Sequence, residues 1–251
     1  MNNTVKELLR AAGVDIGRYR SRRSLDGFLE VVLTAYDINV VIDVGANVGQ
    51  YARKVRKLGF VGEIVSFEPI PSTYSLLVEM MGKDMQWRGF NKALGREPGV
   101  VQMVYEPGQT DMASLYSPSK SVPEILQRWE AAKKEEVTVQ MDTLDTLFSE
   151  CVARISKPNV FLKCDTQGHD LDVLQGGLCS LPHISVVQIE VPVVHLYDNL
   201  RSFGEIMNAI REMDFLPCAF YPVTTIGREG ITVLEFDCLA VRSSRATVEL
   251  S

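Results

Sequence analysis

Residues 40–51, VVIDVGANVGQY, decide the fold of this chain. Four of the first five are β-branched and apolar, which is typical of a strand buried on both faces of a parallel sheet. Gly45 allows a tight turn and lets a ligand approach the backbone closely. Asn47 can cap the amphipathic helix that the pattern predicts from Tyr51 to Leu58. A buried strand, a glycine loop and a helix N-terminus in this order are typical of a cofactor site in a doubly wound α/β fold.

The composition of the chain limits the class of protein. Of its 251 residues, 46% are hydrophobic and 23% are charged, which suits the core of one large α/β domain. The net charge of −6 argues against a nucleic-acid binder. No apolar run approaches the roughly 18 residues of a membrane span, and no signal-peptide core is seen at the N-terminus. Five scattered cysteines without a C-x-x-C pair indicate reduced thiols, so we expect a cytoplasmic protein.

The pattern divides the chain into a helical N-terminal extension, residues 1–38, and one α/β domain, residues 39–251. The extension contains a basic segment, Arg18–Arg23, which is either a solvated connector or an arm that meets an anionic substrate or a membrane surface. In the domain, strands and helices alternate, which predicts βαβ units and a mostly parallel sheet with helices on both faces. After the first strand, the predicted strands are 63–68, 87–94, 159–165 and 184–191, followed by an antiparallel pair at 216–221 and 233–241. One predicted helix follows residue 71 and ends near Met81, and two others span 170–178 and 203–213.

Residues 100–140 interrupt this alternation. They predict a strand at Val100–Tyr105, a loop at Gln109–Ser121, a helix at Val122–Lys134 and a strand at Val137–Met141. An insertion of this length, at about 105–136, is more often a lid or specificity element than an idle loop.

The glycine loop favours one cofactor over another. A dinucleotide site needs G-x-G-x-x-G, and here Asn47 stands at the middle glycine, where a pyrophosphate would meet the backbone. S-adenosylmethionine has no phosphates and tolerates the larger residue, with Asp43 and Gln50 near its methionine portion. Glu68, at the end of the second strand, can accept the ribose hydroxyls of either cofactor.

Four blocks in order, VIDVGANVGQY, VSFEP, FNKALG and VFLKCDTQGHDLDVLQGG, resemble the FkbM family of S-adenosylmethionine-dependent methyltransferases. The resemblance covers about residues 40–242. It implies a Rossmann-like, seven-stranded methyltransferase sheet, mostly parallel with an antiparallel last strand. It also implies O-methylation of sugar or polyketide hydroxyls.

By position, the resemblance assigns residues to the cofactor. It places Gly45, Asn47 and Gly49 at the methionine moiety and Glu68 on the ribose. The remaining cofactor candidates from the resemblance are Asn91 and Ala93 near the adenine and Ser114, in a segment that closes over the cofactor. Many family members have Glu at the positions of Gln167 and Asp170, and a glutamine at 167 is unable to act as a base.

Methyl transfer to a hydroxyl needs a base near the acceptor oxygen. Asp165 is the first candidate because it ends the strand beside the first one, where ligands bind in such sheets. His169 is the second candidate. Lys163 shares the strand face of Asp165 and can hold a carboxylate or an acceptor oxygen. The alternative for this group is a structural role at the strand end and helix cap.

On the acceptor side we expect contacts from Glu190, His195 and Tyr197. Asp165, His169 and Glu190 would together suit a divalent metal ion, although no ligand motif demands one.

The sequence therefore predicts an S-adenosylmethionine-dependent O-methyltransferase that acts on a hydroxyl of a sugar or other secondary metabolite. The partner is a small-molecule acceptor such as a glycosylated metabolite, and a homo-oligomer is an open possibility. Two alternatives stay open, an NAD-dependent oxidoreductase and a non-catalytic S-adenosylmethionine-binding module.

Overall fold

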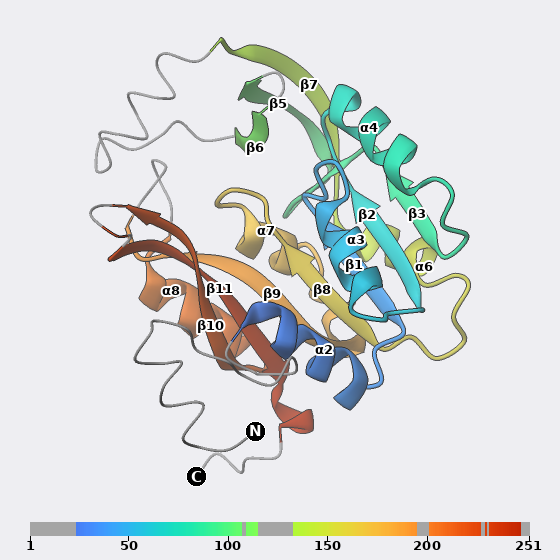
Figure 1. Cartoon of the computed structure of the whole chain (residues 1–251), viewed down its shortest axis with the longest axis vertical. Helices are drawn as coiled ribbons and strands as arrows, with labels where there is room; N and C mark the ends of the chain where they lie inside the picture. The colour runs from blue at the N-terminus through green and yellow to red at the C-terminus, as the bar shows by residue number, and fades with distance from the viewer. Residues whose placement is uncertain are drawn as a thin grey trace, which may run out of the picture.

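The computed structural model describes residues 24–106, 109–114, 133–194, 201–226, 229 and 231–246, with backbone alone for 109–114. Its centre is a seven-stranded sheet with the strand order β10-β11-β9-β8-β1-β2-β3 (Figure 1). These strands span Val40–Val44 (β1), Glu63–Phe67 (β2), Trp87–Phe90 (β3), Val160–Cys164 (β8), Ile184–Pro192 (β9), Phe215–Ile226 (β10) and Thr232–Arg242 (β11). Strands β3, β2, β1, β8 and β9 are parallel, and β11 is antiparallel between β9 and β10. The predicted sheet with its reversed last strand is confirmed.

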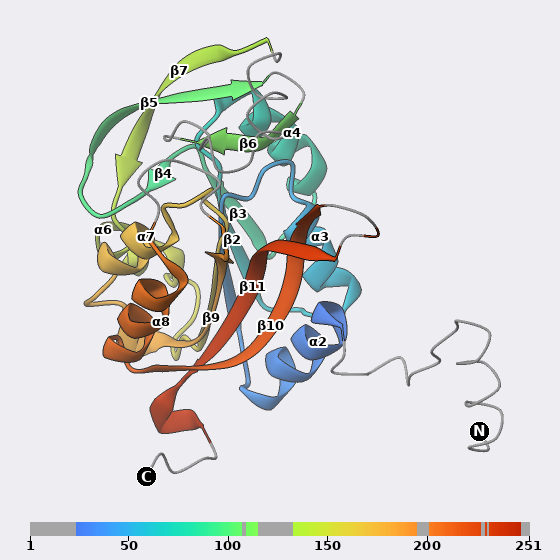
Figure 2. The same ribbon diagram turned by 90° about the vertical axis from the view of Figure 1, so that its left-hand side faces the viewer.

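Helices cover both faces of this sheet (Figure 2). One face carries α2 (Leu25–Ala35), α3 (Gln50–Lys57) and α4 (Pro71–Met81), and the other carries α6 (Leu144–Cys151), α7 (Asp170–Gln175) and α8 (Phe203–Glu212). Every residue of β1, β2 and β8 is buried, which explains their nearly continuous apolar sequences. Alternate residues of each strand therefore pack into one of two separate apolar cores.

A second, four-stranded sheet stands beside the glycine-loop end of the first. It has the order β4-β7-β5-β6, from Ala93–Leu94 (β4), Glu135–Asp142 (β7), Gly99–Glu106 (β5) and Gln109–Ser114 (β6). The strands predicted near 100–105 and 137–141 are confirmed as β5 and β7.

Two of the predicted elements are wrong in part, and one helix of the structure was not predicted. The loop predicted at 109–121 is wrong over Gln109–Ser114, which pairs with β5 as β6. The single strand predicted at 87–94 is two, because β3 pairs in the main sheet and β4 pairs with β7. Helix α6 was missed, although Thr143 accepts a capping bond from the backbone of Thr146.

Some predictions lie on other parts of the chain. The basic segment Arg18–Arg23 and most of the helix predicted at 122–134 lie outside the described residues. Within the described part, no helix is long and apolar enough to cross a membrane.

Candidate active site

Backbone hydrogen bonds to the ends of β2 and β8 hold the glycine loop after β1 in place. The N–H groups of Gly45 and Ala46 donate to the carbonyl of Phe67 at 3.0 and 2.9 Å, and Asp165 N donates to Val44 O at 3.0 Å. Gly45 has φ +74°, and a Cβ atom there would lie 1.9 Å from the carbonyl oxygen of Asp165. Glycine is therefore needed at position 45 because the end of β8 passes against the loop.

The N-cap of α3 is Gly49, and not Asn47 as predicted. Gly49, with φ +86°, is the N-cap of α3, and that helix has no side-chain cap bond. A Cβ on Gly49 would lie 2.9 Å from Leu77 Cδ1, so the small residue lets α3 pack against α4. The prediction that Asn47 caps the helix is wrong: Asn47 has φ 49° and donates its backbone N–H to Glu68.

Glu68 follows β2 directly and is buried, at 5% exposure. Its Oε2 accepts from Asn47 N at 3.0 Å and its Oε1 from Ile70 N at 2.9 Å. Burial raises the pKa of Glu68 to about 7, against the two N–H donors, which lower it. Each carboxylate oxygen keeps a second lone pair, so the group can still accept a hydroxyl.

Of the other expected cofactor residues, Asn91 contacts the loop that carries Glu68. Asn91 donates its side-chain amide to the carbonyls of Glu68 and Pro69, both at 2.9 Å, and so braces the loop after β2. Gln50 begins α3, Ala93 begins β4 in the second sheet, and Ser114 ends β6, where it pairs with Val104.

Lys163 on β8 lies under the glycine loop and joins several groups. Its Nζ is 3.1 Å from Asp43 Oδ1, 3.2 Å from Asp165 Oδ2 and 3.2 Å from the carbonyl oxygen of Gly45. The side chains of Lys163 and Asp43 are 6% and 0% exposed. Burial would lower the pKa of Lys163, but the charges of Asp165 and Asp43 outweigh it and raise that pKa well above its usual range. Lys163 is therefore a permanent cation that holds two carboxylates.

A row of polar side chains continues from Lys163 across the sheet, on the face covered by α3. Lys163 is paired in register with Gln188 of β9 and lies 5.3 Å from the ring centre of Tyr51. The hydroxyl of Tyr51 donates to Gln188 Oε1 at 2.8 Å, and Gln188 in turn donates to Asp237 of β11. Sequence reasoning missed Gln188 and Asp237. A polar residue inside the apolar run ISVVQIEV was the available signal.

The side chain of Asp165 is 37% exposed and is more accessible than those of Lys163 and Asp43. Its second oxygen, Oδ1, accepts from Gln167 Nε2 at 3.3 Å. The same Nε2 lies 3.2 Å from Glu190 Oε2, so the structure brings Asp165 and Glu190 together through one amide. Burial, and then the charge of Asp165, raise the pKa of Glu190 well above its usual range, which favours the protonated form of Glu190.

Two further acids of β11 lie near Glu190. Asp237 is its register partner, and Glu235 is buried at 6% exposure. Burial raises the pKa of Glu235 to about 7. We call Asp165, Glu190, Glu235 and Asp237 the acceptor side, and the glycine loop with Asp43 and Glu68 the donor side.

One contact of His169 is with the helix that follows it. Its Nδ1 lies 3.1 Å from Asp172 Oδ2, one turn further along α7. His195 and Tyr197 lie outside the described residues. Among the described residues, no group of three or more His, Cys, Asp or Glu side chains is arranged to hold a metal ion, so Asp165, His169 and Glu190 do not form the metal set considered above.

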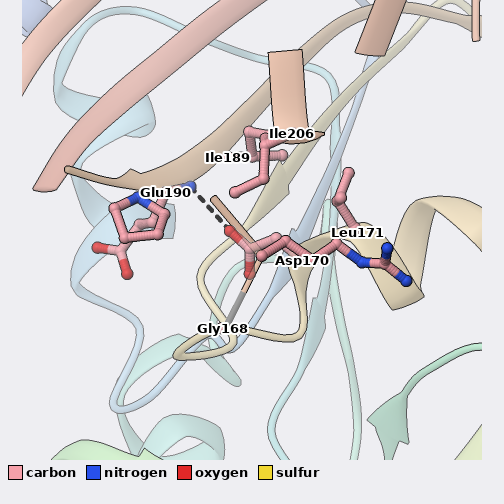
Figure 3. Close-up of a pocket in the computed structure, with 8 residues that line it drawn as sticks. Gly168, Asp170, Leu171, Ile189, Glu190 and Ile206 are labelled. Carbon is pink, nitrogen blue, oxygen red and sulfur yellow. Dashed lines mark hydrogen bonds between the residues drawn. The ribbon is translucent and has the colours of Figure 1, made fainter. Parts of the chain in front are cut away.

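A small pocket lies on the opposite face of β9, toward α7 and α8 (Figure 3). Gly168, Asp170, Leu171, Ile189, Glu190, Pro192, Arg201 and Ile206 line it. Its volume of about 20 Å³ is enough for about one water molecule, so it is too small for an acceptor. Asp170 is structural here, because it accepts from Glu190 N at 2.8 Å and from Thr166 N at 2.8 Å.

The donor side fits a cationic methyl donor. Asp43 and Glu68 bring carboxyl groups to the glycine loop, and the cation beside them, Lys163, is already paired with Asp43 and with Asp165 of the acceptor side. A sulfonium and an ammonium group are attracted by such charges, whereas a pyrophosphate is repelled. Asp43 Oδ2 is buried and has no hydrogen-bond partner in the described part of the chain, as expected where further donors belong.

The comparison with known protein families agrees with this chemistry. The family model described as "Methyltransferase FkbM domain" matches residues 43–217. "Methyltransferase 1" of Beauveria bassiana is 26% identical over 148 residues, which cover 56% of this chain and 59% of that protein. "Hexuronic acid methyltransferase AglP" of Haloferax volcanii is 25% identical over 211 residues and 80% of each chain. Among solved structures, magnesium protoporphyrin IX methyltransferase (ChlM) from Synechocystis PCC 6803 with bound SAM has a TM-score of 0.45 and 9% identity, over 96% of this chain and 92% of that one.

Proposed function

This chain belongs to the FkbM family of methyltransferases, which use S-adenosylmethionine, and we propose that it transfers the methyl group to a hydroxyl of a sugar or other secondary metabolite. The observation that carries the proposal is the position of Asp165. Asp165 directly follows β8, the strand next to β1, and its carboxyl group is accessible to solvent. Its partner Lys163 contacts the carbonyl oxygen of Gly45 in the glycine loop, and the backbone N–H of Asp165 donates to Val44 O.

S-adenosylmethionine supplies a methyl group bonded to a positively charged sulfur. In the transfer, the acceptor oxygen forms a bond to the methyl carbon, the carbon–sulfur bond breaks with its electron pair going to sulfur, and the hydroxyl proton leaves. Asp165 is the group that takes this proton, because its carboxyl group is both paired with Lys163 and within reach of solvent. Burial raises the pKa of Glu190 and so favours its protonated form, in which it donates a hydrogen bond to the acceptor instead.

His169 is the weaker candidate base. Its ring is 14% exposed and its Nδ1 faces Asp172. An imidazole held against its own helix supports the start of α7.

The acceptor side also suggests the charge of the acceptor. Its described groups are four carboxyl groups, two of them on β11. Such a site offers hydrogen-bonding partners to neutral polyhydroxyl compounds, and whichever of its acids is ionised repels a carboxylate-bearing compound. The protein therefore acts on a neutral glycoside, in contrast to the substrate in the printed name of the Haloferax volcanii relative.

Asp165→Asn tests the proposal, with Asp26→Asn, on the exposed surface of α2, as its matched control. We expect Asp165→Asn to bind S-adenosylmethionine within about threefold of the wild type by calorimetry and to lose about 10²–10⁴-fold in kcat, as expected for a lost base. His169→Asn should lose less than about tenfold. Unchanged turnover in Asp165→Asn, or a larger loss in His169→Asn, would contradict the assignment.

The acceptor is tested with matched pairs of neutral glycosides and hexuronates in the same methyl-transfer assay. We expect a higher kcat/KM for the neutral member of each pair. A preference for the hexuronate would overturn the charge argument while leaving methyl transfer itself intact. Turnover of any acceptor excludes a non-catalytic binding module.

A further inference from the structure

Gln167 lies between two acids of the candidate active site. Its Nε2 is 3.3 Å from Asp165 Oδ1 and 3.2 Å from Glu190 Oε2. Both neighbours are carboxyl oxygens, so the amide nitrogen, with its two hydrogens, faces them and the amide oxygen does not. One hydrogen is available for each acid.

The backbone is shaped to hold this amide in place. Gln167 has φ 51° and Gly168 has φ 102°, so the chain curls back after β8. A non-glycine residue keeps such a conformation only where its surroundings impose it. Asp170 does so, because its buried carboxylate accepts from Thr166 N and from Glu190 N and ties the loop to β9. Figure 3 shows the bond between Glu190 and Asp170.

Two carboxyl groups at one partly buried site repel each other unless something lies between them. Around Glu190, the charged groups on the packed elements are mainly acidic: Asp165 after β8, Asp170 on α7, and Glu235 and Asp237 on β11. Lys163 is on β8 and pairs with Asp165 from the donor side. A shared proton, a metal ion or a group with two N–H donors can each join the two acids.

We propose that Gln167 is a positioning residue of methyl transfer, whose amide bridges Asp165 and Glu190 and so orients both toward the acceptor. This proposal rests on the proposed function. The bridge gives the two acids different roles. Asp165, held by Lys163, takes the proton of the acceptor. Burial raises the pKa of Glu190 and so favours its protonated form, in which it donates one hydrogen bond.

The test uses two variants and one matched control. Gln167→Met keeps the length of the side chain and removes the amide. Gln167→Glu puts a third carboxyl group between the other two. Because three neighbouring carboxylates repel one another, the cluster must then bind a proton or a cation. Gln102→Glu makes the same charge change on the exposed surface of β5.

In Gln167→Met we expect kcat to fall about 10- to 100-fold, while the Kd of S-adenosylmethionine stays within about threefold. In Gln167→Glu we expect the acidic limb of the kcat/KM profile to move to higher pH, because three acids share the site. By calorimetry with Mn²⁺ alone, Gln167→Glu should bind the ion at least about tenfold more tightly than the wild type or Gln102→Glu. A kcat within twofold of wild type in Gln167→Met, or Mn²⁺ affinity no higher in Gln167→Glu than in Gln102→Glu, would overturn the proposal.

The Mn²⁺ measurement needs no turnover, so the two ideas can fail separately. If the wild type transfers no methyl group to any hydroxyl, the proposed function fails and the role in transfer fails with it. Tight Mn²⁺ binding by Gln167→Glu would still show that the three side chains meet as the structure has them.

Discussion

On the donor side of the sheet edge, both oxygens of Glu68 accept hydrogen bonds from backbone N–H groups. On the acceptor side, the carboxyl groups of Asp165 and Glu190 are held by the side chains of Lys163 and Gln167. Backbone donors are fixed by the loop that carries them. Side-chain donors move, and the charge of an acid held by them responds to its neighbours. The difference indicates a preformed donor site beside an acceptor site whose protonation can be tuned.

Lys163 is where the two sides meet, since it pairs with Asp43 on one and Asp165 on the other. Replacing it by methionine should have the largest effect on stability, because Asp43 would stay buried without a cation. We expect Lys163→Met to lower the free energy of unfolding by about 3–5 kcal/mol, measured by urea denaturation.

Lys54→Met is the matched control, because the Lys54–Asp26 pair is 3.5 Å apart and both side chains are exposed to solvent. It should cost less than about 1 kcal/mol. Adding Asp43→Asn to Lys163→Met should recover part of the loss, because it removes the unpaired charge. A loss below about 1 kcal/mol in Lys163→Met would mean that the two sides are not joined through this cation.

Gly45 tests the same junction through the backbone. Alanine at Gly45 would bring its Cβ to 1.9 Å from the Asp165 carbonyl at a φ of +74°. We expect Gly45→Ala to lower the unfolding free energy by about 3 kcal/mol and to weaken S-adenosylmethionine binding at least about tenfold, because the end of β8 must shift. Calorimetry measures the second effect.

A substitution at Gly59 is the control that separates the steric clash of an added Cβ from the strain of a positive φ. It has φ +92° and nothing within 4 Å of an added Cβ. Gly59→Ala should therefore cost only about 1 kcal/mol and leave donor binding unchanged. Equal losses in the two variants would show that the contact between Gly45 and Asp165 does not matter.

The smallest expected effect concerns protonation on the acceptor side. Burial raises the pKa of Glu235 from 4.5 to about 7. A raised folded-state pKa stabilises the protein below the unfolded value, and this contribution is lost as pH rises through about 7. Wild-type stability should therefore fall by about 2 kcal/mol between about pH 4.5 and 8 through this group.

Glu235→Gln should flatten that slope in urea titrations at several pH values, and Glu136→Gln, an exposed residue of β7, should leave it as it is. A wild-type slope that Glu235→Gln does not change would show that the acceptor side is not tuned by burial.

The sequence was informative where one physical cause dominates. The apolar runs of β1, β8 and β9 and the order of their connections predicted the sheet, and strand ends placed Glu68, Asp165 and Glu190 at one edge. It failed where partners are distant in the chain. Strand β6 forms in a polar segment because β5 pairs with it, and Asn47 turns its backbone toward Glu68, 21 residues away.

The contacts of the Gln167 amide were also beyond prediction from the sequence, because its partners are set by the path of the loop. Its inability to act as a base was evident from its residue type, but its place between Asp165 and Glu190 depends on how the loop curls after β8. No local pattern encodes a contact with a residue 23 positions along the chain.

Transfer of a ¹³C-labelled methyl group from S-adenosylmethionine to a neutral glycoside, followed by NMR, tests the central claim most directly. We predict that the label appears on a carbon bonded to oxygen in the wild type and at a rate about 10²–10⁴-fold lower in Asp165→Asn. Label found only on nitrogen, sulfur or carbon, or transfer at the wild-type rate in Asp165→Asn, would contradict it.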